Sequence, residues 1–375
     1  MALPLSGCGE DGAASAPTGA SPSTMPVRLQ WNANSGYCGE AAFIAAGMTL
    51  GQYTSQWTAR QLAAGSPDAD QADVANHLLL TWPAGGSTWQ RAARAMRLQA
   101  EGFDPEWGAG PPGSGADAFL GWIEARSRAG SRVIIGVLNN TNLLEEDAPG
   151  APEYDHIVAV MRIGAGEITI GDNGLFRPFI SGTNWGSGNT AGNPRHSTLY
   201  TSGVRAVQKS RAAANQVGAA CPFSSRGEIT NACAPWVYSI YDDATGEGNY
   251  GVAIPGVVDR TPGGSVTAPV RVTTSTNNEG IQDQAEMSSP PPGKPMSITA
   301  TVTIPDTSQA WNVYLYDDFA DVPTGSFNAS ARMSPRRVAR MWTVPAGSGA
   351  TWSTTLRNAR TDGTYVFRAV PATAP

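Results

Sequence analysis

The chain has 375 residues, of which 41% are hydrophobic and 15% are charged, and its formal net charge is −6. This length predicts two domains rather than one. The 25 basic residues form no cluster, which argues against a nucleic-acid partner, and no apolar run approaches the roughly 18–20 residues that span a bilayer.

The N-terminal segment, residues 1–26, suggests where in the cell the protein is located. Its tetrapeptide LSGC, ending at Cys8, resembles the lipobox of bacterial lipoproteins, in which the cysteine carries a lipid. The following residues are rich in Ala, Ser, Gly, Thr and Pro, as in a flexible tether. The basic and apolar regions of a signal peptide do not precede the motif, so lipidation and a chance match both stay open. We expect a secreted or cell-envelope bacterial protein that contacts a membrane only through a lipid on Cys8.

Residues 27–210 are expected to form an α+β domain, because helical patterns come first and paired strand patterns follow. The glycine-containing segment 164–166 predicts a hairpin between the last two strands. We predict helices over 38–50, 87–100 and 116–129, and strands over 132–138, 156–163 and 167–172.

Residues 211–245 form a predicted connecting segment with two cysteines, Cys221 and Cys233, in a polar loop. A disulfide between them would fit an exported protein, and two reduced thiols are the alternative. Since no histidine stands near either cysteine, zinc is not expected, and we predict no metal or other cofactor.

Residues 246–375 are predicted to be all-β, because short apolar runs alternate with Gly, Pro and Asn turns. The run 296–304 places every second residue, from Met296 to Ile304, on one apolar face. The fold class expected for the whole chain is therefore an α+β domain followed by an all-β sandwich-like domain.

Cys38 is the strongest candidate for a nucleophile. It would stand in the first turn of its helix, where unpaired N–H groups and the positive end of the helix dipole favour a thiolate. Gly36 and Gly39 on either side permit a tight turn and the close approach of a substrate. A buried inert cysteine and a disulfide partner are the alternatives.

His156 is the histidine best placed to serve as a base. It begins one predicted strand, and Asp172 ends the next, so a hairpin would bring the carboxylate beside the imidazole. His77 lies in an apolar segment with no acid placed to orient it, and His196 is predicted to lie in a loop.

The order of these residues resembles that of the papain-like cysteine peptidase superfamily, and most closely its bacteriocin-processing, or double-glycine, branch. The likeness rests on "Q-x7-CGEAAFI", "YDHIVAV" and "IGDNG", and it covers residues 27–205. It implies a papain-like fold with Cys38 as nucleophile, His156 as general base and acid, and Asp172 as the group that orients His156. It also implies an oxyanion hole made by the Gln30 side chain and the Cys38 backbone N–H.

The chain departs from this family pattern in several ways. Gln30 stands eight residues before the cysteine, a longer gap than in papain. Asn173 directly follows Asp172 and is a second candidate for the third member, and Asn184 is a weaker one. Transporter spans and nucleotide-binding motifs are not seen, so a role in bacteriocin export is not implied.

Three hypotheses for function follow. The first is a secreted or lipid-anchored cysteine peptidase or amide hydrolase that acts on a peptide or protein substrate. The second is a catalytically inactive surface protein that uses its β-sandwich for adhesion or glycan binding, with aromatic platforms that include Trp311 and Tyr314. The third is an acyl transferase of the transglutaminase or ligase type that uses the same residues.

Overall fold

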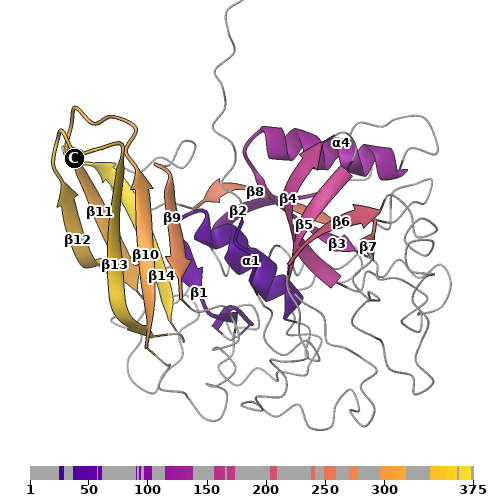
Figure 1. Cartoon of the computed structure of the whole chain (residues 1–375), viewed down its shortest axis with the longest axis horizontal. Helices are drawn as coiled ribbons and strands as arrows, with labels where there is room; N and C mark the ends of the chain where they lie inside the picture. The colour runs from indigo at the N-terminus through magenta and orange to yellow at the C-terminus, as the bar shows by residue number, and fades with distance from the viewer. Residues whose placement is uncertain are drawn as a thin grey trace, which may run out of the picture.

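The computed structural model describes part of the chain, and within that part the protein is mostly β structure with few helices (Figure 1). The described residues are 25–28, 37–56, 58–60, 90, 93, 97–103, 115–137, 156–164, 167–173, 203–208, 238–240, 249–258, 270–277, 295–317, 338–360 and 363–372.

A seven-stranded sheet with strand order β2-β8-β3-β4-β5-β6-β7 forms one half of the molecule. Neighbouring strands are antiparallel except β6 and β7, which pair in parallel. The strands are β2 (Leu98–Gly102), β3 (Arg132–Val137), β4 (His156–Gly164), β5 (Glu167–Asp172), β6 (Gly203–Gln208), β7 (Tyr238–Ser239) and β8 (Gly251–Val257).

Two helices cover opposite faces of this sheet. Helix α4 (Gly115–Arg128) packs Phe119, Trp122 and Ile123 against one face, together with Val133, Val158 and other apolar residues of the strands. Helix α1 (Cys38–Met48) packs on the other face, against residues such as Ile134 and Ile157. The predicted helices 38–50 and 116–129 and the predicted strands of this region are confirmed within two residues.

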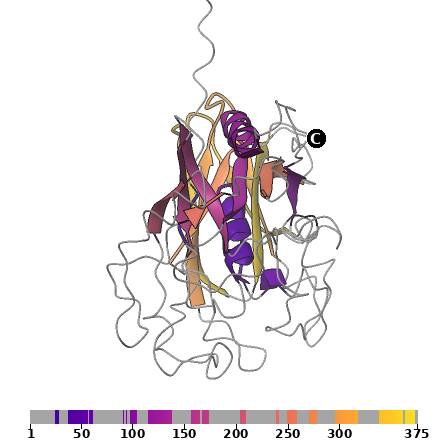
Figure 2. The same ribbon diagram turned by 90° about the vertical axis from the view of Figure 1, so that its right-hand side faces the viewer.

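Two further sheets pack face to face and form a sandwich, which lies behind the seven-stranded sheet in Figure 2. The predicted alternation of 296–304 is confirmed, since Met296, Ile298, Ala300, Val302 and Ile304 are all buried. One sheet has the order β1-β14-β11-β12 and the other β13-β10-β9. Their bounds are β1 (Gln52–Thr54), β9 (Val272–Thr276), β10 (Pro295–Thr303), β11 (Trp311–Asp317), β12 (Val338–Val344), β13 (Thr351–Arg360) and β14 (Thr364–Pro371).

The predicted domain boundary at residue 246 needs correction. Strand β8 falls in the predicted sandwich region but pairs with β2 and β3 in the seven-stranded sheet. Strand β1 falls in the predicted α+β region but pairs with β14 of the sandwich. Local patterns identify a strand but not its partner, because pairing is set by distant packing. The two halves therefore exchange strands.

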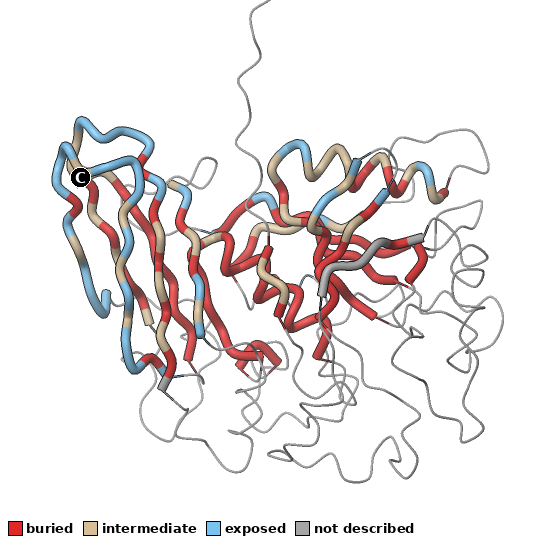
Figure 3. Tube along the Cα trace, in the orientation of Figure 1, coloured by how far each residue is buried: buried red, intermediate tan, exposed pale blue. Residues whose placement is uncertain are grey.

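Helix α1 lies between the two halves and is buried along its whole length (Figure 3). One continuous apolar core joins α1 to the inner faces of both sandwich sheets. At its end, Gly51 has φ +76, and its carbonyl accepts the N–H of Phe367 at 2.7 Å. The helix that begins at Cys38 therefore packs against the seven-stranded sheet on one side and against the sandwich on the other.

Residues 87–100 were predicted to be helical throughout, and their last part is not. Gln90 and Ala93 are helical, but Leu98 begins strand β2, after Arg97 with φ 51. The pairing of β2 with β8 overrides a helix propensity that is weak per residue. Strand β13 was not predicted, because its outward residues are polar over most of its length.

Candidate active site

Cys38 is the first residue of α1, as the sequence predicts. It follows Tyr37, whose carbonyl accepts the N–H of Ala41 at 3.0 Å and so closes the first turn. Cys38 is 6% exposed and is the free cysteine of the described residues. The sulfur therefore lies at the positive end of a helix dipole, in surroundings with little water.

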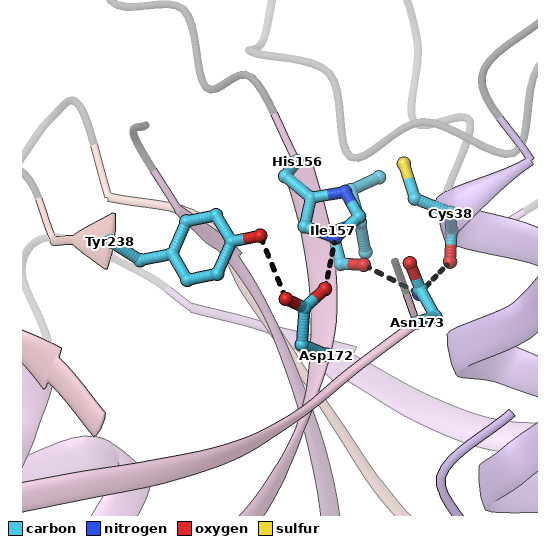
Figure 4. A network of polar contacts seen from close by, with 6 residues as sticks. All are labelled: Cys38, His156, Ile157, Asp172, Asn173 and Tyr238. Carbon is cyan, nitrogen blue, oxygen red and sulfur yellow. Dashed lines mark hydrogen bonds and ion pairs between the residues drawn. The ribbon is translucent and has the colours of Figure 1, made fainter. Parts of the chain in front are cut away.

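His156 and Asp172 meet across the β4–β5 hairpin, as the sequence predicts. His156 Nε2 lies 3.1 Å from Asp172 Oδ1, and both side chains are buried (Figure 4). The strands are antiparallel neighbours, with Ala159 opposite Gly171. This register puts Asp172 across from Val158, two residues from His156 on the same face of the sheet, so that residues separated by 16 positions come into direct contact.

The second ring nitrogen of His156, Nδ1, is on the Cys38 side of the imidazole (Figure 4). Within the described part of the chain, Nδ1 makes no hydrogen bond. Burial alone would lower the pKa of His156, but the hydrogen bond to Asp172 and the hydrogen-bonding ability and charge of Cys38 raise it to about 9. A pKa of about 9 favours the protonated imidazole near neutral pH.

Tyr238 is a site residue that the sequence analysis missed. Its hydroxyl donates to Asp172 Oδ2 at 2.9 Å, and its ring centroid lies 5.6 Å from that of His156. Tyr238 comes from β7, which pairs in parallel with β6. The strand-like run "WVYSIY" could have drawn attention to this segment, but nothing in the sequence indicates that it lies beside Asp172.

Asn173 does not take the third position of the site. Its side-chain amide donates to the carbonyl of Cys38 at 2.9 Å and to that of Ile157 at 3.0 Å. It therefore ties the start of α1 to β4 and fixes the spacing between the cysteine and histidine backbones. Asp172 is the carboxylate that contacts the imidazole.

Several sequence predictions fall outside the described residues. These are Gln30 as an oxyanion-hole donor, the Cys221–Cys233 disulfide, the lipid on Cys8, and the roles considered for His77, His196 and Asn184. Within the described ranges no group of three or more His, Cys, Asp or Glu could hold a metal ion, and no helix is long and apolar enough to cross a membrane.

Comparisons with family models, curated proteins and solved structures find no match to this chain. The chemistry of the site thus rests on its own geometry. A thiol beside an imidazole, with a buried carboxylate behind the imidazole, is an arrangement that can generate a thiolate and return a proton to a leaving group.

Proposed function

We propose that this protein is a cysteine hydrolase that cleaves a peptide or related amide bond, with Cys38 as nucleophile. The observation that carries the proposal is the buried His156–Asp172 pair, 3.1 Å apart, whose second ring nitrogen, Nδ1, lies on the side of Cys38 at the start of α1 (Figure 4). Burying a charged imidazole costs free energy, and a cysteine that only filled space in the core would gain nothing from a charged imidazole nearby.

The resemblance to papain-like peptidases supports the same roles. Two antiparallel strands supply the histidine and the carboxylate, and a buried helix begins at the cysteine. We propose a papain-like arrangement for residues 27–210, completed by Tyr238 and β8. Export to the cell envelope, with a lipid on Cys8, belongs to the same proposal.

The reaction would proceed in two steps. The Cys38 thiolate attacks the carbonyl carbon, and the C–N bond breaks as His156 Nδ1 gives its proton to the leaving amine. Neutral His156 then takes a proton from water, the resulting hydroxide attacks the thioester carbon, and the C–S bond breaks. The products are an amine and a carboxylic acid, and the thiolate–imidazolium pair is restored.

The proposal is tested by peptide turnover. The full chain is incubated with a mixture of unstructured peptides, and new termini are identified by mass spectrometry. Cleavage that disappears in Cys38→Ala and in His156→Ala, but not in Asp117→Asn on the exposed side of α4, is the expected result. Cleavage that survives in Cys38→Ala would contradict the proposal.

Acyl transfer is the second candidate, because the same thioester can react with an amine instead of water. Burial of Cys38 and His156 favours this candidate, since a site with little water gives an amine an advantage. Adding an amine to the peptide assay distinguishes the two: a peptide–amine adduct in place of the free acid indicates transfer.

A further inference from the structure

A second buried charged pair lies beside the site, between Glu40 of α1 and Arg60. Arg60 Nε donates to Glu40 Oε1 at 2.6 Å, and neither side chain is exposed to solvent. The two residues are 20 positions apart in the chain, on either side of β1. The hydrolysis scheme uses neither of them, although burying two charges carries a large desolvation cost.

The same guanidinium also contacts the residue that precedes the nucleophile. Arg60 Cζ lies 3.4 Å from the ring centroid of Tyr37, a cation–π contact. Tyr37 immediately precedes Cys38, and Glu40 follows it by two positions. Arg60 therefore contacts both flanks of the turn on which Cys38 stands.

We propose that Arg60 is a positioning residue that fixes this turn and supplies a second positive charge to the Cys38 thiolate, with Glu40 limiting the strength of that charge. The inference rests on the proposed function, because it takes Cys38 as the nucleophile. In a buried site a fixed charge acts over longer distances than in water, so Arg60 need not touch the sulfur.

The electrostatics of Arg60 are consistent with this role. Burial would lower the pKa of the guanidinium, but the charges of Glu40, Tyr37 and Cys38 and the hydrogen bond to Glu40 raise it. Within the described part of the chain, the charged groups that the site brings near Cys38 include His156 from β4, with Asp172 behind it, Arg60, and Glu40 from α1 itself. Asn173 contributes a neutral amide.

Alkylation of Cys38 tests the inference without any substrate. The full chain is treated with iodoacetamide at about pH 6, where a thiol of ordinary acidity is almost wholly neutral, and the rate of adduct formation at Cys38 is followed by mass spectrometry. Glu40→Gln leaves the guanidinium unbalanced, so we expect alkylation at least about threefold faster. Arg60→Lys keeps the charge and is expected to stay within about twofold of the wild type.

The double variant Glu40→Gln with Arg60→Gln removes both charges and is expected to slow alkylation at least about threefold. The matched control is Glu124→Gln with Arg128→Gln, an exposed ion pair on α4, which should leave the rate unchanged. Far-ultraviolet circular dichroism checks that each variant is folded. If the double variant does not fold, the rate of Glu40→Gln decides, with Arg60→Lys as the charge-conserving comparison.

Failure of this inference can be distinguished from failure of the proposed function. A folded Glu40→Gln variant and a folded double variant that both alkylate at the wild-type rate, over the whole pH profile, would show that the pair is structural only and would overturn this inference. A wild-type Cys38 that iodoacetamide does not label at all would overturn the nucleophile assignment, and the inference with it.

Discussion

Asp172 Oδ1 contacts Nε2 of His156 and leaves Nδ1 on the side of Cys38. The two ring nitrogens therefore face different side chains, so one imidazole can bind a carboxylate through Nε2 and present Nδ1 toward a thiol. Tyr238 donates to the second carboxylate oxygen, so both Asp172 oxygens are engaged. The result is a chain of four buried side chains that begins at the cysteine and ends at a tyrosine in β7.

Replacing Asp172 by Asn should lower the pKa of His156. Without the carboxylate, Cys38 still raises the pKa but opposes the effect of burial less than the pair does, and the pKa falls from its value of about 9. Since the imidazolium protonates the leaving amine, the alkaline limb of kcat/KM should move to lower pH, and activity near pH 8 should fall by roughly tenfold to a hundredfold. The measurement is the pH profile of peptide cleavage. An alkaline limb that does not move would contradict this role for Asp172.

The stability of the protein should fall as pH rises toward 9 and beyond. The folded-state pKa of His156, about 9, lies above the ordinary value of 6.5, so the protonated imidazole favours the folded state. This contribution is complete below about pH 6.5 and is lost as pH rises through about 9. Urea unfolding at several pH values measures it. The wild type should lose about 2–3 kcal/mol more over this window than His156→Gln, and parallel curves for the two proteins would contradict the expectation.

Tyr238→Phe should impair both stability and the reaction. The change removes the donor to Asp172 Oδ2 and leaves a buried carboxylate oxygen without that hydrogen bond, at a cost of about 1–3 kcal/mol. The matched control is Tyr365→Phe, because the Tyr365 hydroxyl bonds to the Arg360 backbone in the sandwich and not to a site residue named above. Urea unfolding should show both losses, whereas the cleavage rate should fall in Tyr238→Phe alone. Equal cleavage rates in the two variants would exclude a positioning role for Tyr238.

Gly51→Ala should test how the two halves are joined. A Cβ at Gly51 would lie 2.8 Å from the Phe367 carbonyl oxygen and 2.9 Å from Val272 Cβ, in addition to the strain of φ +76. Gly130→Ala is the control, because φ there is +85 but nothing lies within 4 Å. Strain alone costs about 1–2 kcal/mol, and Gly51→Ala should cost clearly more in a urea unfolding experiment. Equal losses would mean that Phe367 and Val272 can move away from a Cβ at Gly51 at little cost.

Local patterns predicted most elements but not how they assemble. The helix at Cys38 and the β4–β5 hairpin follow from short-range periodicity and turn residues, so His156 and Asp172 could be paired from sequence alone. The partners of β1 and β8 could not be predicted, because each pairs with a strand far away in the chain. Strand pairing at this range depends on packing that leaves no local signal.

The same reasoning explains which site residues were missed. Tyr238 reaches Asp172 only because β7 joins the edge of the seven-stranded sheet, 66 residues further along the chain. Arg60 meets Glu40 because α1 and the segment after β1 fold back on each other. Asn173 was a second candidate after Asp172, and the structure shows that Asp172 contacts the imidazole whereas Asn173 ties α1 to β4.

The most direct test of the central assignment is the rate at which iodoacetamide alkylates Cys38 at about pH 6 in the wild type and in His156→Ala. A cysteine paired with a charged imidazole should be labelled selectively, and its rate should fall by at least about tenfold when the imidazole is removed. Peptide mapping by mass spectrometry locates the adduct and measures the rate. Labelling at Cys38 that proceeds equally fast in both proteins would contradict the thiolate–imidazolium pair and, with it, the proposed hydrolase.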